Sequence, residues 1–107
     1  MKVNRFEIYL VGLDPTLGSE MAKTRPCLVV SPNEVAHYVR TVIVAPMTTT
    51  SKPYPFRVAC AFQGTTGSIA LDQLRAVDKS RLGKLLGTLD QPTQDAVLER
   101  LAEFFAS

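Results

Sequence analysis

The sequence has little of what most enzyme sites require. It contains no tryptophan, one histidine and two cysteines among 107 residues. The histidine, His37, lies in a polar connection without an obvious carboxylate or cysteine neighbour, which disfavours a histidine-based triad or a zinc site and favours an exposed or helix-turn histidine. The glycines form no phosphate-binding loop, and the acids form no metal-binding cluster in sequence. We therefore expect no metal and no cofactor, so that any catalysis must use Arg, Glu, Asp, Thr and backbone groups.

Long apolar runs are also missing. The first apolar run, residues 6–11, is too short for a signal peptide or a membrane span and is interrupted by Glu7 and Gly12. We therefore expect a cytoplasmic protein without a membrane partner.

Cys27 and Cys60 each lie within an apolar run, where a free cysteine behaves as a small hydrophobic residue, so buried reduced thiols are favoured over a disulfide.

Length and composition are those of one globular domain, expected to span residues 1–107. The chain is 46% hydrophobic and 21% charged, which is typical of an ordinary folded domain. Its charge is uneven: residues 1–84 carry eleven Lys/Arg against six Asp/Glu, a net of +5, whereas residues 85–107 carry one Arg against four acids, a net of −3. The basic part is compatible with a phosphate-bearing ligand, although solubility alone also explains such an excess.

Short β-prone runs dominate most of the chain. They predict strands at residues 6–11, 27–30, 41–46, 55–62 and 67–72, with residues 74–77 extending the last of these and residues 84–89 forming a final short strand. The run 27–30 has no polar alternation, so it is expected to be a central strand buried on both faces. Residues 33–38 are a connection long enough for one helical turn, and residues 63–66 are rich in turn residues.

The pattern changes to a helical period from residue 92. The apolar stripe consists of Val97, Leu98, Leu101, Phe104 and Phe105, and the acids Asp95, Glu99 and Glu103 lie on the other face. Pro92 suits the first turn, with Asp90 or Gln91 as the cap. Strands followed by one terminal helix predict an α+β fold, namely a small, strongly bent antiparallel β-barrel with a C-terminal amphipathic α-helix packed on one side.

The most informative residues form ordered motifs. The segment 13–26 holds Asp-Pro-Thr at 14–16, Gly-Ser-Glu at 18–20 and Arg-Pro at 25–26, just before a hydrophobic strand. Pro-Met-Thr-Thr at 46–49, Tyr-Pro-Phe at 54–56 and Leu-Asp-Gln-Leu-Arg at 71–75 follow in order. Together these motifs closely resemble the signature of the MazF/PemK family of toxin endoribonucleases, and the resemblance covers about residues 5–105. It implies the CcdB/PemK-like toxin barrel.

The resemblance also implies a function. Proteins of this kind are homodimeric toxins of toxin–antitoxin systems that cut single-stranded mRNA at specific sequences and so arrest growth. The implied reaction needs no metal and leaves a 2′,3′-cyclic phosphate and a 5′-hydroxyl, with Arg25 and Thr48 as the catalytic pair. The implied partner is a labile cognate antitoxin, acidic and partly disordered, that lies across the same basic groove.

The chemistry of these residue types agrees with that implication. Cleavage by the RNA 2′-hydroxyl builds negative charge around phosphorus, and a guanidinium supplies fixed, bidentate donors for that charge. Because a guanidinium keeps its proton at neutral pH, electrostatic stabilisation is the expected role of Arg25. Thr48 would donate its hydroxyl to a phosphate oxygen, while Glu20 would orient Arg25 or act as the base. Further RNA contacts are expected from Asp14, Thr16, Ser19, Lys23, Thr49, Lys52, Asp72, Gln73 and Arg75.

Several of these residues also have a purely structural interpretation. Without the family resemblance, Arg25 would be taken for a surface residue paired with Asp14 or Glu20. The threonines at 48–50 would be β-prone edge residues. Asp72 and Gln73 are equally compatible with an ordinary turn, and neither interpretation is favoured.

The sequence departs from part of the family at two positions. Some toxins of this fold carry a histidine and an arginine where this chain has Ser19 and Ala70. Their absence disfavours a mechanism that uses that His–Arg pair and favours the version that uses Arg25 and Thr48.

Two other functions compete with RNA cleavage. A CcdB-like toxin that inhibits gyrase shares the fold, but its activity depends on a C-terminal Trp-Gly-Ile, whereas this chain has no tryptophan and ends Phe-Phe-Ala-Ser. A non-catalytic small-barrel module that binds RNA or protein is compatible with the composition. If RNA is the substrate, we expect the loops 14–25 and 48–55 to recognise its bases.

Overall fold

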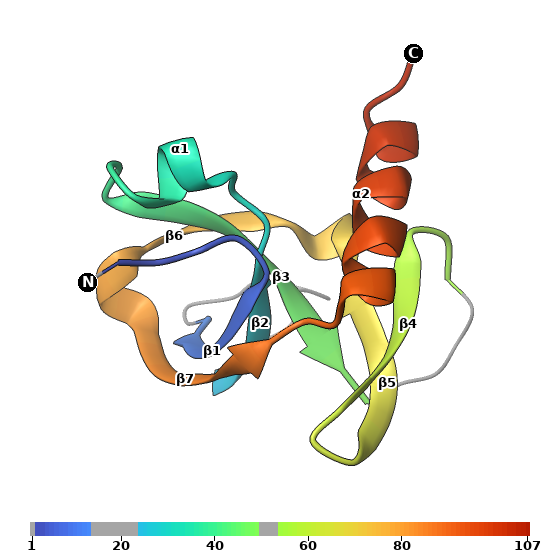
Figure 1. Cartoon of the computed structure of the whole chain (residues 1–107), viewed down its shortest axis with the longest axis horizontal. Coiled ribbons are helices and arrows are strands. Elements are labelled where there is room, and N and C mark those ends of the chain that lie inside the picture. The colour runs from blue at the N-terminus through green and yellow to red at the C-terminus, as the bar shows by residue number, and fades with distance from the viewer. Residues whose placement is uncertain (1, 14–23, 50–53) are drawn as a thin grey trace.

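The computed structural model describes residues 2–13, 24–49 and 54–107. These residues form a strongly curled antiparallel sheet, a half-barrel, with the C-terminal helix beside it (Figure 1). The elements are β1 (Glu7–Gly12), β2 (Thr24–Val29), α1 (Asn33–Ala36), β3 (Thr41–Thr48), β4 (Arg57–Phe62), β5 (Thr65–Ala70), η1 (Leu71–Gln73), β6 (Arg75–Asp78), η2 (Lys79–Arg81), β7 (Leu82–Thr88) and α2 (Gln91–Phe104). The expected α+β class and the helical turn between the second and third strands are confirmed.

Strand β3 is the centre of the sheet. The strand order is β4-β5-β3-β2-β1-β7, and β6 also pairs with β3. One edge of β3 pairs with β2, while the other pairs first with β6 along residues 41–44 and then with β5 at Met47 and Thr48. All these pairings are antiparallel, so the end of β3 is held between β2 and β5.

Several sequence-based strand boundaries differ from the structure, and two of these differences have a clear physical reason. Residues 74–77 were expected to extend the strand before them, but the 3₁₀ turn η1 interrupts it, and β6 then resumes pairing with β3 in a shifted register. The inserted turn lies where the curl of the sheet changes the chain direction. In the hairpin, Gln63 and Gly64 alone make the turn, with φ of 53° and 76°, so β5 begins at Thr65. Two left-handed residues are the requirement of a two-residue type I′ turn.

The strand β2 contributes to two apolar clusters. Cys27 and Val29 belong to a cluster with residues of β1, β3, β6 and β7. Leu28 and Val30 belong to the other, with residues of β3, β4, β5 and α2. None of the four is more than 6% exposed, and the alternation between clusters shows that both faces of the strand are covered, as the uninterrupted apolar run predicts.

Both cysteines are free thiols. Cys27 is fully buried, and burial raises its pKa to about 12. Cys60 is half-buried, and burial raises its pKa as well. The expectation of reduced cysteines is confirmed, although Cys60 lies at the margin of the core rather than within it.

The start of α2 is fixed by local chemistry. The Asp90 carboxylate accepts a hydrogen bond from the backbone N–H of Thr93 at 3.2 Å, and Pro92 lies in the first turn. The carboxylate satisfies a backbone donor that the helix itself leaves without a partner. These caps confirm the predicted helix start. No helix within the described ranges is long and apolar enough to cross a membrane.

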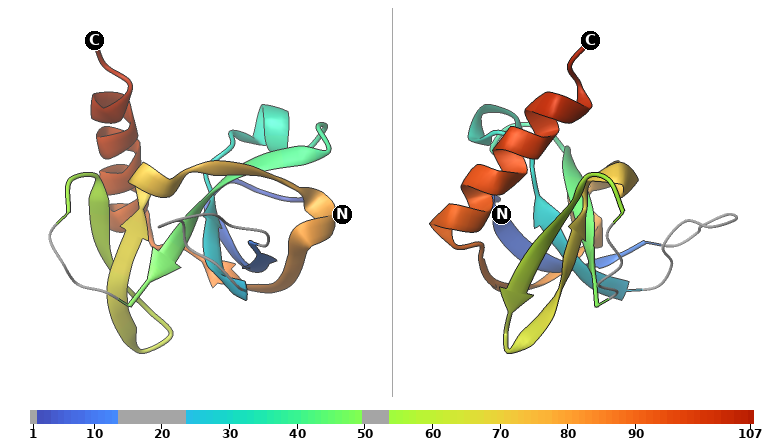
Figure 2. Two further views of the ribbon diagram at one scale, coloured as in Figure 1. Left: turned by 180° about the vertical axis from the view of Figure 1, so that it is seen from behind. Right: turned by 90° about the vertical axis from the view of Figure 1, so that its right-hand side faces the viewer.

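The apolar stripe of α2 is covered only in part. Val97 is fully buried and Leu101 packs partly against the core, but Phe105 is 71% exposed. The Phe104 ring contacts Phe56 edge to face at a centroid distance of 5.0 Å. Figure 2 shows that the C-terminal end of the helix projects beyond the sheet. The predicted burial is therefore correct for Val97 and in part for Leu101. The other residues of the stripe are more exposed, at 38% for Leu98, 39% for Phe104 and 71% for Phe105. Phe105 is exposed because the helix extends beyond the sheet.

Candidate active site

The ends of β2 and β3 bring Arg25 and Thr48 to neighbouring positions. Cys27 pairs with Pro46 across the two strands, and Arg25 and Thr48 each lie two residues beyond this pair, at the adjoining ends of β2 and β3. Opposed residues of an antiparallel pair project from the same face of the sheet. The two residues of the predicted catalytic pair are therefore on adjacent strand ends, and their catalytic role remains a prediction.

The position of Thr48 depends on a glycine across the sheet. Thr48 pairs with Ser68 on β5, a buried polar residue that is 5% exposed. A Cβ atom at the preceding Gly67 would overlap the carbonyl oxygen of Thr48 and would lie 3.1 Å from the Cα of Thr49. Only glycine therefore lets β5 approach the end of β3 this closely. No local sequence signal marks Gly67, since its role depends on a neighbour across the sheet.

Three arginines meet near the C-terminal end of β1. Arg25 lies across from this strand in the β1–β2 register. Arg75 donates from Nη1 to the carbonyl oxygen of Leu13 at 3.2 Å, and Arg81 donates from Nη1 to that of Gly12 at 3.3 Å. Among the described residues, the arginines near this strand end provide positive charge, which attracts phosphate. Arg75 was predicted as a site residue from the sequence. Arg81 was not predicted, and the only sequence feature that marks it is the second basic residue nearby, Lys79.

The Cys27 thiol lies near these arginines, but its pKa is dominated by its burial. Burial raises the pKa of Cys27, and the positive charges of Arg25 and Arg75 act in the opposite direction. Arg25 and Cys27 are two residues apart on β2, so their side chains project from the same face of the sheet. The thiol nevertheless keeps its proton at neutral pH, since burial dominates, and it does not supply a nucleophile.

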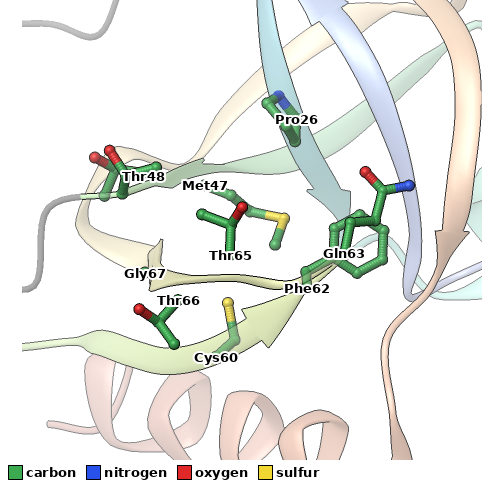
Figure 3. A pocket seen from close by; sticks show the side chains of 10 residues that line it. Pro26, Met47, Thr48, Cys60, Phe62, Gln63, Thr65, Thr66 and Gly67 are labelled. Atoms are coloured by element: carbon green, nitrogen blue, oxygen red, sulfur yellow. The ribbon is translucent and has the colours of Figure 1, made fainter.

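A pocket of about 250 Å³ adjoins Thr48 (Figure 3). It is lined by the ends of β2 and β3 and by the β4–β5 hairpin, through Pro26, Met47, Thr48, Thr49, Cys60, Phe62, Gln63, Thr65, Thr66 and Gly67. None of these lining residues is charged. Thr48 lies on one side of the pocket and Phe62 with Gln63 on the other. The hairpin residues were not expected at the site, because residues 63–66 had the composition of an ordinary turn.

Asp72 is held by an ion pair. Arg57 donates from Nε to Oδ1 at 2.6 Å and from Nη2 to Oδ2 at 3.1 Å. These hydrogen bonds hold the pKa of Asp72 below its ordinary value and raise that of Arg57. The ring of Tyr54 lies 5.0 Å from the Arg57 guanidinium carbon. The observed pairing supports a structural role for Asp72 on η1, and an RNA contact by Asp72 or by Gln73 remains a prediction.

His37 also has a structural partner. It follows α1 as the C-cap residue, and its Nε2 lies 2.9 Å from Oδ1 of Asn4. Across the described ranges, no three His, Cys, Asp or Glu side chains gather as metal ligands. The chemistry that remains on the described strand ends is that of guanidinium, hydroxyl and backbone groups.

The structure places only part of the predicted site. Arg25 and Thr48 lie on the ends of adjacent strands, the exposed Thr49 lies on the pocket wall, and Arg75 lies in the arginine cluster. The predicted residues outside the described ranges are Asp14, Thr16, Ser19, Glu20, Lys23 and Lys52.

Comparison with known proteins identifies the family. The family model described as "PemK-like, MazF-like toxin of type II toxin-antitoxin system" matches residues 4–105. The chain is 38% identical over 106 residues to endoribonuclease PemK of Escherichia coli, which covers 94% of this chain and 80% of that protein. The chain therefore belongs to the PemK-like, MazF-like toxin family.

Solved structures agree with this assignment. The fold is similar to that of MazF from Deinococcus radiodurans, with a TM-score of 0.83 and 25% identity over 97% of this chain and 96% of that one. It is also similar to an endoribonuclease from a mycobacterial species solved in complex with its cognate antitoxin, with a TM-score of 0.80 and 25% identity over 94% of this chain and 92% of that one.

The close approach at Gly67 predicts a cost for any side chain there. Gly67→Ala should lower the free energy of unfolding by about 1–3 kcal/mol, because β5 must move away from the end of β3. Gly12→Ala is the matched control, since a Cβ at Gly12 has nothing within 4 Å, and it should change stability by less than about 0.5 kcal/mol. Urea unfolding measures both, and equal stabilities of the two variants would contradict the packing argument.

The ion pair of Asp72 predicts a pH-dependent contribution to stability. Its pKa in the folded state is lowered, so the stabilisation is complete above the unfolded-state pKa of about 3.9 and is lost as pH falls through the folded-state pKa. Asp72→Asn should cost about 1 kcal/mol or less at neutral pH, since solvent screens the pair, and progressively less as the pH falls below the unfolded-state pKa. Glu103→Gln, in the exposed pair with Arg100, is the control. A difference for Asp72→Asn that does not change with pH would rule out the ion pair as its source.

Proposed function

We propose that this chain is a toxin that acts as a sequence-specific endoribonuclease on single-stranded RNA, including mRNA, and thereby arrests growth. The observation that carries the proposal is the position of Arg25 and Thr48 on adjacent strand ends, next to the arginine cluster. The name of the Escherichia coli relative, endoribonuclease PemK, supports the same class of activity. The proposed place of action is the cytoplasm, where mRNA is found.

In the proposed reaction, a ribose 2′-oxygen attacks the adjacent phosphorus. The bond between phosphorus and the 5′-oxygen of the next nucleotide breaks. The 2′-hydroxyl proton passes to a base, and the departing 5′-oxygen takes up a proton. The products are a 2′,3′-cyclic phosphate and a 5′-hydroxyl, and the proposed reaction uses no metal.

The two strand-end residues have different proposed roles. Arg25 stabilises the negative charge that grows on the nonbridging phosphate oxygens, because its donors are fixed in a fork and stay charged. Thr48 donates its hydroxyl to one of the same oxygens. Glu20 is the proposed base, or the group that orients the guanidinium. Arg75 and Arg81 add long-range attraction for the RNA backbone.

We further propose two protein partners. The first is a cognate antitoxin, since the mycobacterial relative was solved with one. An acidic segment would complement the arginine cluster and compete with RNA for the same site. The second is another copy of this chain, in a homodimer with one active site on each subunit.

Replacement of the strand-end residues tests the proposed site. Arg25→Ala and Thr48→Val should each lower kcat on a mixed-sequence RNA in EDTA by about 100-fold or more, as the loss of a donor to developing charge does in other enzymes. Arg25→Lys should rescue only part of the loss, because it keeps the charge and lacks the fork. Thr41→Val, at an exposed β3 position at the other end of the strand, is the control and should cleave normally.

The rival functions give different outcomes in the same assays. A wild-type protein that leaves RNA intact in EDTA but stalls gyrase on DNA would be a gyrase toxin. Binding of RNA without cleavage would indicate a binding module. Unchanged cleavage by folded Arg25→Ala and Thr48→Val would remove both residues from the active site.

A further inference from the structure

The pocket beside Thr48 is placed to receive part of the same substrate. It shares Thr48 with the proposed catalytic pair, while its wall residues Pro26 and Met47 belong to the face of the sheet opposite that of Arg25. A phosphate held between Arg25 and Thr48 would therefore lie beside the strand end that borders the pocket. The part of RNA within reach of that phosphate is the sugar and base of an adjoining nucleotide.

The size and the walls of the pocket suit a flat ring. About 250 Å³ is below the range of roughly 300–1,000 Å³ that holds drug-sized ligands, so one base fits better than a longer segment. The walls include the apolar side chains of Met47 and Phe62 together with Pro26 (Figure 3). Unstacked bases in RNA complexes commonly pack on aromatic and apolar side chains of this kind.

The polar groups of the pocket favour a neutral occupant. Among the residues that the structure describes, none that lines the pocket is charged. It offers the hydroxyls of Thr65 and Thr66 and the amide of Gln63 instead. An amide both donates and accepts hydrogen bonds, which matches the donor and acceptor pattern on a base edge.

The hairpin that presents these groups is fixed in place. Gln63 and Gly64 form the two-residue turn, and the Gln63 Nε2 donates to the carbonyl oxygen of Leu86 on β7 at 3.4 Å. The Phe62 ring lies so close to Gly87 that a Cβ there would be 3.3 Å from it. Contacts of Phe62 and Gln63 to β7 therefore preorganise the hairpin, which a selective site requires.

We propose that this pocket binds one nucleobase of the RNA, in a nucleotide that adjoins the cleaved phosphate, and that Thr65 and Gln63 recognise the edge of that base. The inference rests on the proposed ribonuclease function. It adds the β4–β5 hairpin to the loops 14–25 and 48–55, which were expected from the sequence to recognise RNA bases.

The first test maps cut sites on a long RNA of mixed sequence. Thr65→Val removes one hydroxyl without changing the size of the side chain, and Gln63→Asn shortens the amide while it tolerates the left-handed turn. Each variant should lose about tenfold in kcat/KM at the preferred sequence and relax the base preference at one position beside the cut, while cleavage at other sites persists. Thr41→Val should give the wild-type map.

The second test removes the base itself. An RNA with an abasic nucleotide at the position identified by the map should be cut about tenfold more slowly than the intact RNA by the wild type. Thr65→Val should show a clearly smaller difference between the two RNAs, because it has already lost a contact to that base. Unchanged maps for both variants, or equal sensitivity of wild type and Thr65→Val to the abasic site, would overturn the pocket assignment while cleavage remains. A wild type that cuts no RNA would overturn the proposed function and this inference with it.

Discussion

The antiparallel pairing of β3 with β2 on one edge and with β5 on the other is the constraint on which the candidate site depends. The first pairing sets Arg25 and Thr48 on adjacent strand ends, and the second fixes the backbone of Thr48 against Gly67. The same two neighbours form the walls of the pocket. A change in either register would separate the arginine cluster from the threonine and would open the pocket, so fold and proposed chemistry share one set of hydrogen bonds.

Charge is divided between two parts of this site. Arg75 and Arg81 donate to backbone carbonyls at the end of β1, and Arg25 lies across from that strand in the β1–β2 register. The adjoining pocket has hydroxyls and an amide but no charged lining residue. RNA presents the same division, since its phosphates are charged and its bases are neutral. The arrangement thus separates attraction of the backbone from recognition of the bases.

Local sequence patterns predicted the features that depend on nearby residues. The unbroken apolar run of β2 predicted burial on both faces, and Asp90 with Pro92 predicted the start of α2, because each signal lies within a few residues of its effect. The 3₁₀ turn η1 and the exposed Phe105 were not predicted, since the curl and extent of the sheet determine both. For the site, ordered motifs led to Arg25 and Thr48. Gly67, Arg81 and Thr65 acquire their positions only through neighbours across the sheet, and the partner of Asp72 is apparent only in the folded chain.

The central claim is that the strand ends of β2 and β3 support cleavage of RNA by its own 2′-hydroxyl. The most direct measurement is digestion of a long mixed-sequence RNA by the wild-type protein in EDTA, followed by analysis of the new ends. The account predicts fragments with 2′,3′-cyclic phosphates and with 5′-hydroxyls that polynucleotide kinase labels without prior dephosphorylation. Fragments with 5′-phosphates, or RNA that stays intact until a divalent metal is added, would contradict it.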